Sequence, residues 1–201
     1  MNNEQTVFVV DDDEGVREGL SLLFESVGQQ CELYSSAFEY LESFDPNRGG
    51  CLVLDIRMPR MTGLDLQKKL NELNASLPIV FITGHGDIQM AVEAMRRGAQ
   101  DFIRKPFREQ DLLDTINEAL DFNKSCRNKL FDQQEKIDRV ALLTEREYEI
   151  FSRIADGDMN KVIGIDLGIS ERTVEVHRSQ AMKKLGVRTL AQLVRIKFQT
   201  E

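Results

Sequence analysis

The chain has 201 residues, of which 41% are hydrophobic and 30% charged, values typical of a globular protein with one large domain or two small ones. Its longest apolar runs are far too short to span a bilayer, and the first residues lack the basic and apolar regions of a signal peptide. We therefore expect a cytoplasmic protein without a membrane partner. Three scattered cysteines and two histidines predict neither a disulfide framework nor a zinc site.

The net charge of −8 is unevenly distributed along the chain. Residues 1–140 contain 16 Lys and Arg against 25 Asp and Glu, whereas residues 141–201 contain 10 against 9. Within residues 170–197 there are 7 basic and 2 acidic side chains, a net charge of +5. An acidic first part and a locally basic second part indicate two units with different partners.

Five short apolar runs alternate with helical patterns over the first 120 residues. The runs cover residues 7–10, 31–34, 51–55, 79–83 and 101–105, and three of them are almost wholly apolar, as strands covered on both faces are. This alternation predicts a doubly wound (βα)5 domain with a parallel sheet. The apolar helix faces that we predict are Val16, Leu20, Leu23 and Val27; Phe38, Leu41 and Phe44; Leu64, Leu66, Leu70 and Leu73; Ile88, Ala91, Val92 and Met95; and Leu112, Leu113, Ile116 and Leu120.

The rest of the chain contains no strand pattern. A polar stretch without Pro or Gly predicts an exposed helical linker, and four helical stretches follow at 145–156, 160–167, 171–185 and 189–198. Gly157, Gly168 and Gly186 lie in the gaps, where glycine commonly ends helices. We predict a first domain at 1–121, a helical linker at 122–139 and a four-helix, all-α domain at 140–201.

Polar residues follow the predicted strands at their carboxyl ends. Asp11 and Asp12 end the first strand, Asp55 the third, Thr83 the fourth and Lys105 the fifth. These ends meet at one edge of a parallel sheet, where open α/β sheets bind ligands. A nest of three carboxylates needs a cation, and an all-oxygen site suits Mg²⁺. With a hydroxyl and a lysine beside it, the site suits phosphoryl transfer to a carboxylate, for which Asp55 on the central strand is the best nucleophile.

The segments "VVDDDE", "LVLDIRMPRMTGLDL", "PIVFITGHGD" and "GAQDFIRKPF" resemble the receiver domain of bacterial two-component response regulators over about residues 4–121. The resemblance implies Asp55 as the phosphoacceptor. It also implies that Asp11, Asp12, Asp55 and the backbone carbonyl of Arg57 are ligands of Mg²⁺. Solvated loop carboxylates are the plain alternative.

The same resemblance implies a conformational switch. Thr83 and Lys105 would sense the phosphate, the Lys105–Pro106 bond would be cis, and Phe102 would rotate as Thr83 moves inward. The responding surface would be the fourth helix, fifth strand and fifth helix, often a dimerisation face in this family. Ordinary core packing of Phe102 is the alternative. His85 is either a solvated loop histidine or, with Arg57, a residue that tunes the lifetime of the phosphoryl group.

In the second part, a short helix, a turn with Gly168 and a longer basic helix predict a helix-turn-helix. Ser170 is a candidate N-cap of the basic helix. The predicted core is Ala155, Ile163, Leu167, Val174, Ala181 and Leu185. "NKVIGIDLGISERTVEVH" resembles the LuxR/FixJ-type DNA-binding domain, over about residues 140–201, although Gly164 stands where that family usually has alanine.

Helix geometry suggests which residues would meet DNA. We expect Glu175, Val176 and Ser179 to face base edges and basic side chains to contact phosphates. The predicted phosphate contacts are Arg172, Arg178, Lys183 and Lys184, and we also predict that Lys161 and Thr173 bind DNA. A solvated basic surface is the alternative, and His177 is a packed histidine or a base reader.

These patterns together predict a transcriptional regulator rather than a metabolic enzyme. The resemblance implies that a sensor histidine kinase phosphorylates Asp55 and that the phosphorylated chain forms a homodimer, binds paired half-sites on double-stranded DNA and contacts RNA polymerase. Two alternatives stay open at this point. Residues 140–201 could bind a protein, which would make the chain a signalling adaptor, or the chain could be a regulator with a vestigial, phosphorylation-independent receiver.

Overall fold

The computed structural model describes residues 5–84 and 88–200. The chain divides into two compact units, Met1–Arg127 and Asn128–Glu201, which we call the N-terminal and the C-terminal unit. No helix in the described ranges is long and apolar enough to cross a membrane.

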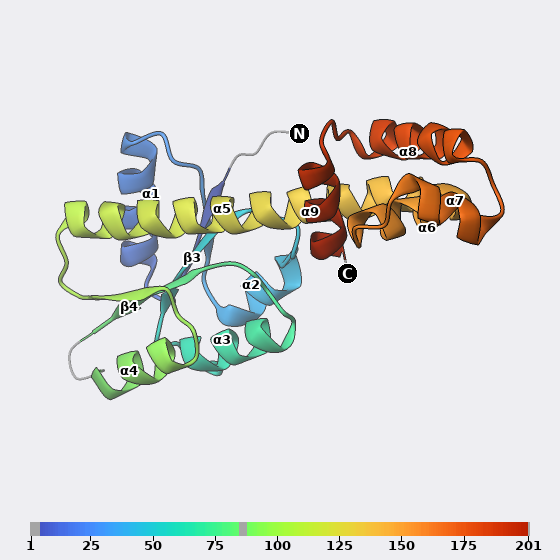
Figure 1. The fold of residues 1–201 in the computed structure, drawn as a ribbon. Helices are drawn as coiled ribbons and strands as arrows, with labels where there is room; N and C mark the ends of the chain where they lie inside the picture. Colours follow the sequence, from blue (N-terminus) through green and yellow to red (C-terminus); the bar gives the residue numbers. More distant parts are fainter. Residues whose placement is uncertain (1–4, 85–87, 201) are drawn as a thin grey trace. The chain divides into compact units, whose positions relative to one another are not determined.

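The N-terminal unit contains a five-stranded parallel sheet with strand order β2-β1-β3-β4-β5 (Figure 1). All residues of β1, β3 and β4 are buried, which agrees with their nearly continuous apolar sequences. The central strand is β3, so its last residue lies between two neighbouring strand ends. The strands are β1 Thr6–Val10, β2 Cys31–Tyr34, β3 Gly50–Asp55, β4 Ile79–Thr83 and β5 Asp101–Arg104.

Helices cover both faces of this sheet, as the (βα)5 prediction requires (Figure 1). One core cluster joins the sheet to α1 and α5, and the other joins its opposite face to α2, α3 and α4. Side-chain caps fix the starts of three helices: Asp13 caps α1, Ser36 caps α2 and Thr62 forms a capping box with Asp65 at α3. The helices are α1 Glu14–Ser26, α2 Ala37–Ser43, α3 Gly63–Glu72, α4 Ile88–Arg96 and α5 Glu109–Ala141.

The predicted apolar faces of two short helices are wrong in part. On α2, Phe38 is exposed, whereas Tyr40 is buried with its ring edge-to-face against neighbouring aromatic rings. On α4, Val92 and Met95 are exposed and the small Ala94 is buried, because a small side chain allows the helix to pack closely. Two further predicted face residues are exposed because they lie just past helix ends: Val27 and Leu73.

The predicted fifth helix and the predicted linker form one helix of 33 residues, α5. Side chains beyond residue 121 still bond to the N-terminal unit. Asn123 is fully buried, accepts a hydrogen bond from the Gly50 amide at 3.1 Å and donates to the Ser76 carbonyl at 3.2 Å. Arg127 donates to the Arg48 carbonyl at 3.3 Å. The compact unit therefore includes the first part of the predicted linker.

Four helices follow in the C-terminal unit, as predicted: α6 Glu145–Ala155, α7 Asn160–Leu167, α8 Glu171–Leu185 and α9 Leu190–Thr200. The left-handed residues Gly168 and Gly186 end α7 and α8, with φ of 64° and 70°, and Ser170 caps α8. The predicted core residues are buried or packed against one apolar cluster, which also contains Ile150, Phe151, Ile154, Leu193 and Ile196.

Candidate phosphoacceptor site and DNA-binding face

The carboxyl edge of the sheet brings together four of the polar residues predicted there. Asp11, Asp55 and Thr83 are buried at the ends of β1, β3 and β4. Lys105 follows β5, and its Nζ donates to Asp11 Oδ2 at 2.7 Å and to Asp55 Oδ1 at 3.0 Å. The Thr83 hydroxyl donates to the Gly84 carbonyl at 3.1 Å. Two buried carboxylates thus share a single cationic nitrogen.

The charges at this edge alter each other's protonation. Burial raises the pKa of Asp55, and the nearby Lys105 ammonium opposes that rise. Burial would lower the pKa of Lys105, but its hydrogen bonds to Asp11 and Asp55 and their charges outweigh this effect and raise that pKa. One ammonium against two carboxylates leaves a net negative site that can attract a further cation.

Backbone amides hold the two carboxylates in place. Asp55 Oδ2 accepts a hydrogen bond from the Arg57 amide at 2.6 Å, and Asp11 Oδ1 accepts one from the Asp13 amide at 2.9 Å. Arg17 Nη1 donates to the Asp11 carbonyl at 2.7 Å, a contact that the sequence reasoning missed. The signal available was a basic residue one turn into α1, which alone is not specific.

Asp12, predicted beside them, is exposed. Over residues 5–84 and 88–200, no three His, Cys, Asp or Glu side chains converge as a metal-binding cluster. Asp11 and Asp55 do lie together, offer only oxygen ligands and already share the Lys105 ammonium. They therefore fit a hard cation such as Mg²⁺. The assignment of Asp12 as a ligand stays a prediction.

The loop after β3 depends on a glycine that the sequence reasoning did not single out. The Gly63 amide donates to the Ile56 carbonyl at 3.0 Å, and a Cβ added at Gly63 would collide with the carbonyl oxygen of Asp55. Only glycine allows this close approach of the start of α3 to the end of β3.

Phe102 lies on β5 with 41% of its surface exposed, so ordinary core packing does not describe it. The Lys105–Pro106 peptide bond is cis. His85 falls outside the described residues, and its predicted alternatives cannot be placed on this edge.

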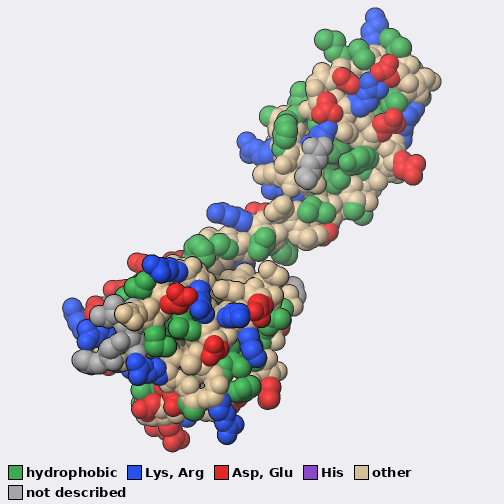
Figure 2. All heavy atoms as spheres, turned by 90° about the horizontal axis from the view of Figure 1, so that it is seen from below, with side chains coloured by type: hydrophobic (Ala, Val, Ile, Leu, Met, Phe, Trp, Pro, Cys, Tyr) green, Lys and Arg blue, Asp and Glu red, His purple; other side chains and the backbone are tan. Residues whose placement is uncertain are grey.

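Most residues predicted to meet DNA are exposed on α8 and at the start of α7: Lys161, Arg172, Glu175, Val176, Ser179 and Lys183. Thr173 is half-buried, with its hydroxyl 2.7 Å from that of Ser170, and Arg178 is half-buried and donates to Asn160 Oδ1 at 3.5 Å. Figure 2 shows one face of the C-terminal unit, at the upper right, on which basic, acidic and hydrophobic side chains are interspersed.

Two side chains of α8 point to structural rather than DNA-contacting roles. Lys184, predicted to contact phosphate, pairs with Glu147 Oε2 at 2.6 Å and donates to the Leu142 carbonyl at 3.2 Å. Lys184 is drawn into this contact because the side chain of Glu147 is only 5% exposed, and a buried carboxylate needs a cation. His177 is half-buried, and its Nδ1 is buried without a hydrogen-bond partner in the described part of the chain, which favours the packed reading.

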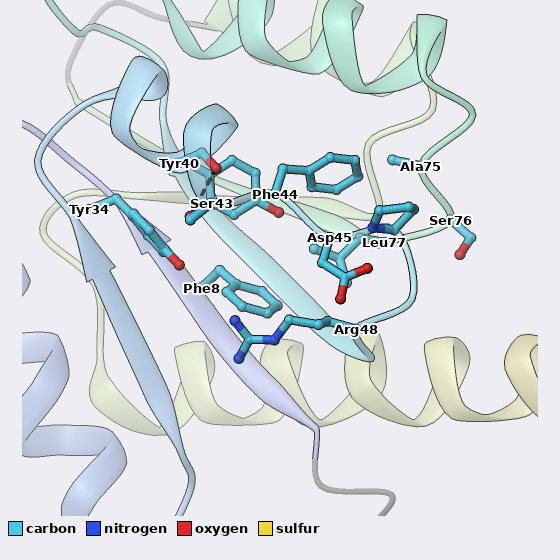
Figure 3. Close-up of a pocket in the computed structure, with 11 residues that line it drawn as sticks. Phe8, Tyr34, Tyr40, Ser43, Phe44, Asp45, Arg48, Ala75, Ser76 and Leu77 are labelled. Atoms are coloured by element: carbon cyan, nitrogen blue, oxygen red, sulfur yellow. Dashed lines mark hydrogen bonds between the residues drawn. The ribbon is translucent and has the colours of Figure 1, made fainter.

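An aromatic cavity in the N-terminal unit is separate from the carboxyl edge (Figure 3). Its walls include Phe8, Tyr34, Tyr40 and Phe44, and Arg48 lies over the Phe8 ring at 4.7 Å from the centroid. The volume of about 10 Å³ is enough for one water molecule at most. The cavity is therefore too small to hold a substrate.

Comparison with known proteins agrees with both units. Residues 7–117 match the response regulator receiver domain, and residues 141–197 match the bacterial regulatory proteins of the luxR family. The chain is 44% identical to the response regulator protein TmoT of Ectopseudomonas mendocina, over 98% of this chain and 90% of that one. It is 40% identical to the transcriptional regulatory protein FixJ of Rhizobium meliloti (strain 1021), over 96% and 95%. A low-resolution structure of the response regulator StyR aligns with a TM-score of 0.91 at 47% identity, over 98% of this chain and 99% of that one.

Proposed function

Because this chain belongs to the response regulators that join a receiver domain to a LuxR-type DNA-binding domain, we propose that phosphorylation of Asp55 by a sensor histidine kinase controls its binding to DNA. One observation carries the assignment of Asp55. Its carboxylate ends the central strand, is buried, and shares the Lys105 ammonium with Asp11.

In the proposed transfer, an Asp55 carboxylate oxygen attacks the phosphorus of a phosphohistidine, the P–O bond forms and the P–N bond breaks. The kinase imidazole leaves with the electron pair of that bond and takes up a proton. The Lys105 ammonium, already 3.0 Å from Asp55 Oδ1, pairs with a phosphoryl oxygen, and the Thr83 hydroxyl donates to another. Mg²⁺, held by Asp11, Asp55, the Arg57 carbonyl and Asp12, would screen the charge of the phosphoryl oxygens. The reaction acts on the chain's own carboxylate and not on a metabolic substrate.

The conformational switch couples phosphorylation at the carboxyl edge to dimerisation. Movement of Thr83 toward the phosphoryl group leaves space that Phe102, exposed in this structure, can enter. The surface formed by α4, β5 and the first part of α5 changes with it and pairs with a second copy. We assign the receiver to 1–121, the helical linker to 122–139, whose first residues pack on the receiver, and the DNA-binding domain to 140–201.

On DNA, α8 docks in the major groove with Glu175, Val176 and Ser179 toward base edges. A homodimer presents two such helices to paired half-sites, which adds specificity that one helix lacks. The regulator contacts RNA polymerase there, and we place it in the cytoplasm because that is where bacterial DNA lies. Arg172, Arg178 and Lys183 contact the DNA backbone, and Lys161 and Thr173 are further DNA-binding residues.

The test compares wild type with Asp55→Asn after incubation with acetyl phosphate and Mg²⁺. Wild type should gain one phosphoryl group by intact-mass spectrometry, sediment as a dimer and select a sequence from a randomised duplex pool. Asp55→Asn should remain unmodified and monomeric and select no sequence under the same conditions. Equal labelling of the two proteins would reject Asp55, and equal selection would favour the phosphorylation-independent reading.

A further inference from the structure

The last turn of α8 is bonded to the segment that precedes α6. Arg139, near the end of α5, donates from Nη1 to the Leu185 carbonyl at 3.2 Å, and Lys184 donates to the Leu142 carbonyl at 3.2 Å. The last carbonyls of a helix have no donor within the helix, and cations suit its negative end. Arg139 therefore satisfies an acceptor that the fold itself leaves open.

Two further contacts orient the Arg139 guanidinium. Its Nη2 donates to Glu135 Oε1 at 2.7 Å, one turn earlier on the same helix. It also lies against the turn that follows α8, because a Cβ added at Gly186 would collide with Arg139 Nη1. The left-handed glycine, with φ of 70°, leaves the space that the guanidinium fills.

A second attachment lies beside the first. Glu147 accepts hydrogen bonds from Lys184 at 2.6 Å and from the Thr144 amide at 2.8 Å, with its side chain 5% exposed. The end of α8 is thus fastened to α5, to the loop after it and to α6. The base-reading residues lie at the other end, because Glu175 is about 15 Å from Leu185 along a helix with 1.5 Å rise per residue.

We propose that Arg139 is a positioning residue for DNA recognition, which sets the axis of α8 and so determines how well the chain discriminates between base sequences. The proposal rests on the docking of α8 in the major groove. Hydrogen bonds to base edges weaken steeply with misalignment, whereas contacts of long cationic side chains to phosphates tolerate it. Arg139 precedes the segment 141–197 that matches the luxR family, and its Nη1 and Nη2 both donate hydrogen bonds within the unit.

The experiment uses the full chain, phosphorylated with acetyl phosphate, and a duplex that wild type selects from a randomised pool. Arg139→Ala should bind the selected duplex about tenfold more weakly, as expected for one lost charge-assisted hydrogen bond. Its affinity for a shuffled duplex should change less than about twofold, and the dependence of binding on salt should stay as in wild type, because no phosphate contact is removed. Arg139→Lys, which can still reach the Leu185 carbonyl, should recover part of the loss.

Arg127→Ala is the matched control. This arginine lies on the same helix and also donates to backbone carbonyls, but in the N-terminal unit, so both affinities should remain as in wild type. If Arg139→Ala is poorly folded by circular dichroism, Glu135→Ala replaces it, since that change removes the acceptor of Nη2 and leaves the guanidinium in place, and it should lower the ratio of the two affinities in the same direction. Equal losses on the two duplexes, or no loss, would overturn the proposal. Failure of wild type to select any sequence would instead overturn the docking of α8 itself.

Discussion

Replacement of Lys105 by methionine should make the stability of the N-terminal unit depend on Mg²⁺. The lysine is 26% exposed, and the two carboxylates that it pairs with are 3% and 10% exposed. Each contact is worth roughly 5 kcal/mol at an effective dielectric constant of about 20, and the cost of removing the ammonium from water offsets much of the sum. Loss of one partner from a buried pair costs about 3–5 kcal/mol, and the partial exposure of Lys105 places it at the lower end. We expect Lys105→Met to lower the free energy of unfolding by about 3 kcal/mol in EDTA.

In excess Mg²⁺ the loss should shrink to below about 1 kcal/mol, because a divalent cation supplies the missing charge and stabilises the state that binds it. Amide hydrogen exchange of β1 and β3 measures this in the full chain, because it reports the opening of the N-terminal unit separately. Lys68→Met is the control: Lys68 is 69% exposed, and its Nζ lies 4.0 Å from Glu72. Removal of this exposed pair should cost less than about 0.5 kcal/mol with or without Mg²⁺. A Lys105→Met loss as small as this, or one that Mg²⁺ leaves unchanged, would refute the shared-cation account.

Three further predictions concern buried contacts. Asn123→Ala should destabilise the N-terminal unit by about 3 kcal/mol, because it leaves a backbone donor and an acceptor unpaired, and hydrogen exchange of β3 would register this. The hydrogen bond from Lys184 lowers the pKa of Glu147 below its ordinary value of 4.5. The ionised carboxylate therefore stabilises the fold above pH 4.5, and this stabilisation is lost as the pH falls through the folded pKa. The difference in unfolding free energy between wild type and Glu147→Gln, measured in urea, should close below about pH 4.5, and a difference that widens there would contradict this reasoning. Gly164→Ala should lower the stability of α7 by about 1 kcal/mol in hydrogen exchange, whereas a gain would show that the neighbouring turn moves aside.

The gathering of polar residues at the carboxyl edge of the sheet could be predicted because it depends on a regular feature of the fold. In a parallel sheet every strand ends at the same edge, so Asp11, Asp55 and Lys105 had to lie together once the strands were identified. The pattern could not show that Lys105 would bridge the two carboxylates, since that depends on side-chain distances of about 3 Å. Nor could it show that Arg17 would bind the Asp11 carbonyl, because a basic residue on an exposed helix usually remains in solvent.

Helix faces were harder to predict when the helix was short. In the seven residues of α2 and the nine of α4, several faces contain two or three apolar residues, and the sheet decides which one is buried. Tyr40 and Ala94 are the residues buried against the sheet. A search for large aliphatic residues overlooks both of them. In α5 the same reasoning succeeded, because Leu112, Ile116 and Leu120 repeat one face over several turns.

At Gly164, helix propensity alone predicts that alanine would raise the stability of α7, whereas the close contact in the structure predicts that it would lower it. Helix propensity favours alanine over glycine at this position by about 1 kcal/mol. In this chain a Cβ at Gly164 would lie 2.9 Å from the carbonyl oxygen of Ile169, and a backbone atom cannot rotate away as a flexible side chain does. The Ile169 amide also donates to the Gly164 carbonyl at 2.9 Å, so the two segments are held together at the point where the added methyl would push them apart. Overpacking of this kind costs about 1–3 kcal/mol, which exceeds the gain in propensity. The residue that weakens α7 as an isolated helix therefore strengthens the turn that leads into α8.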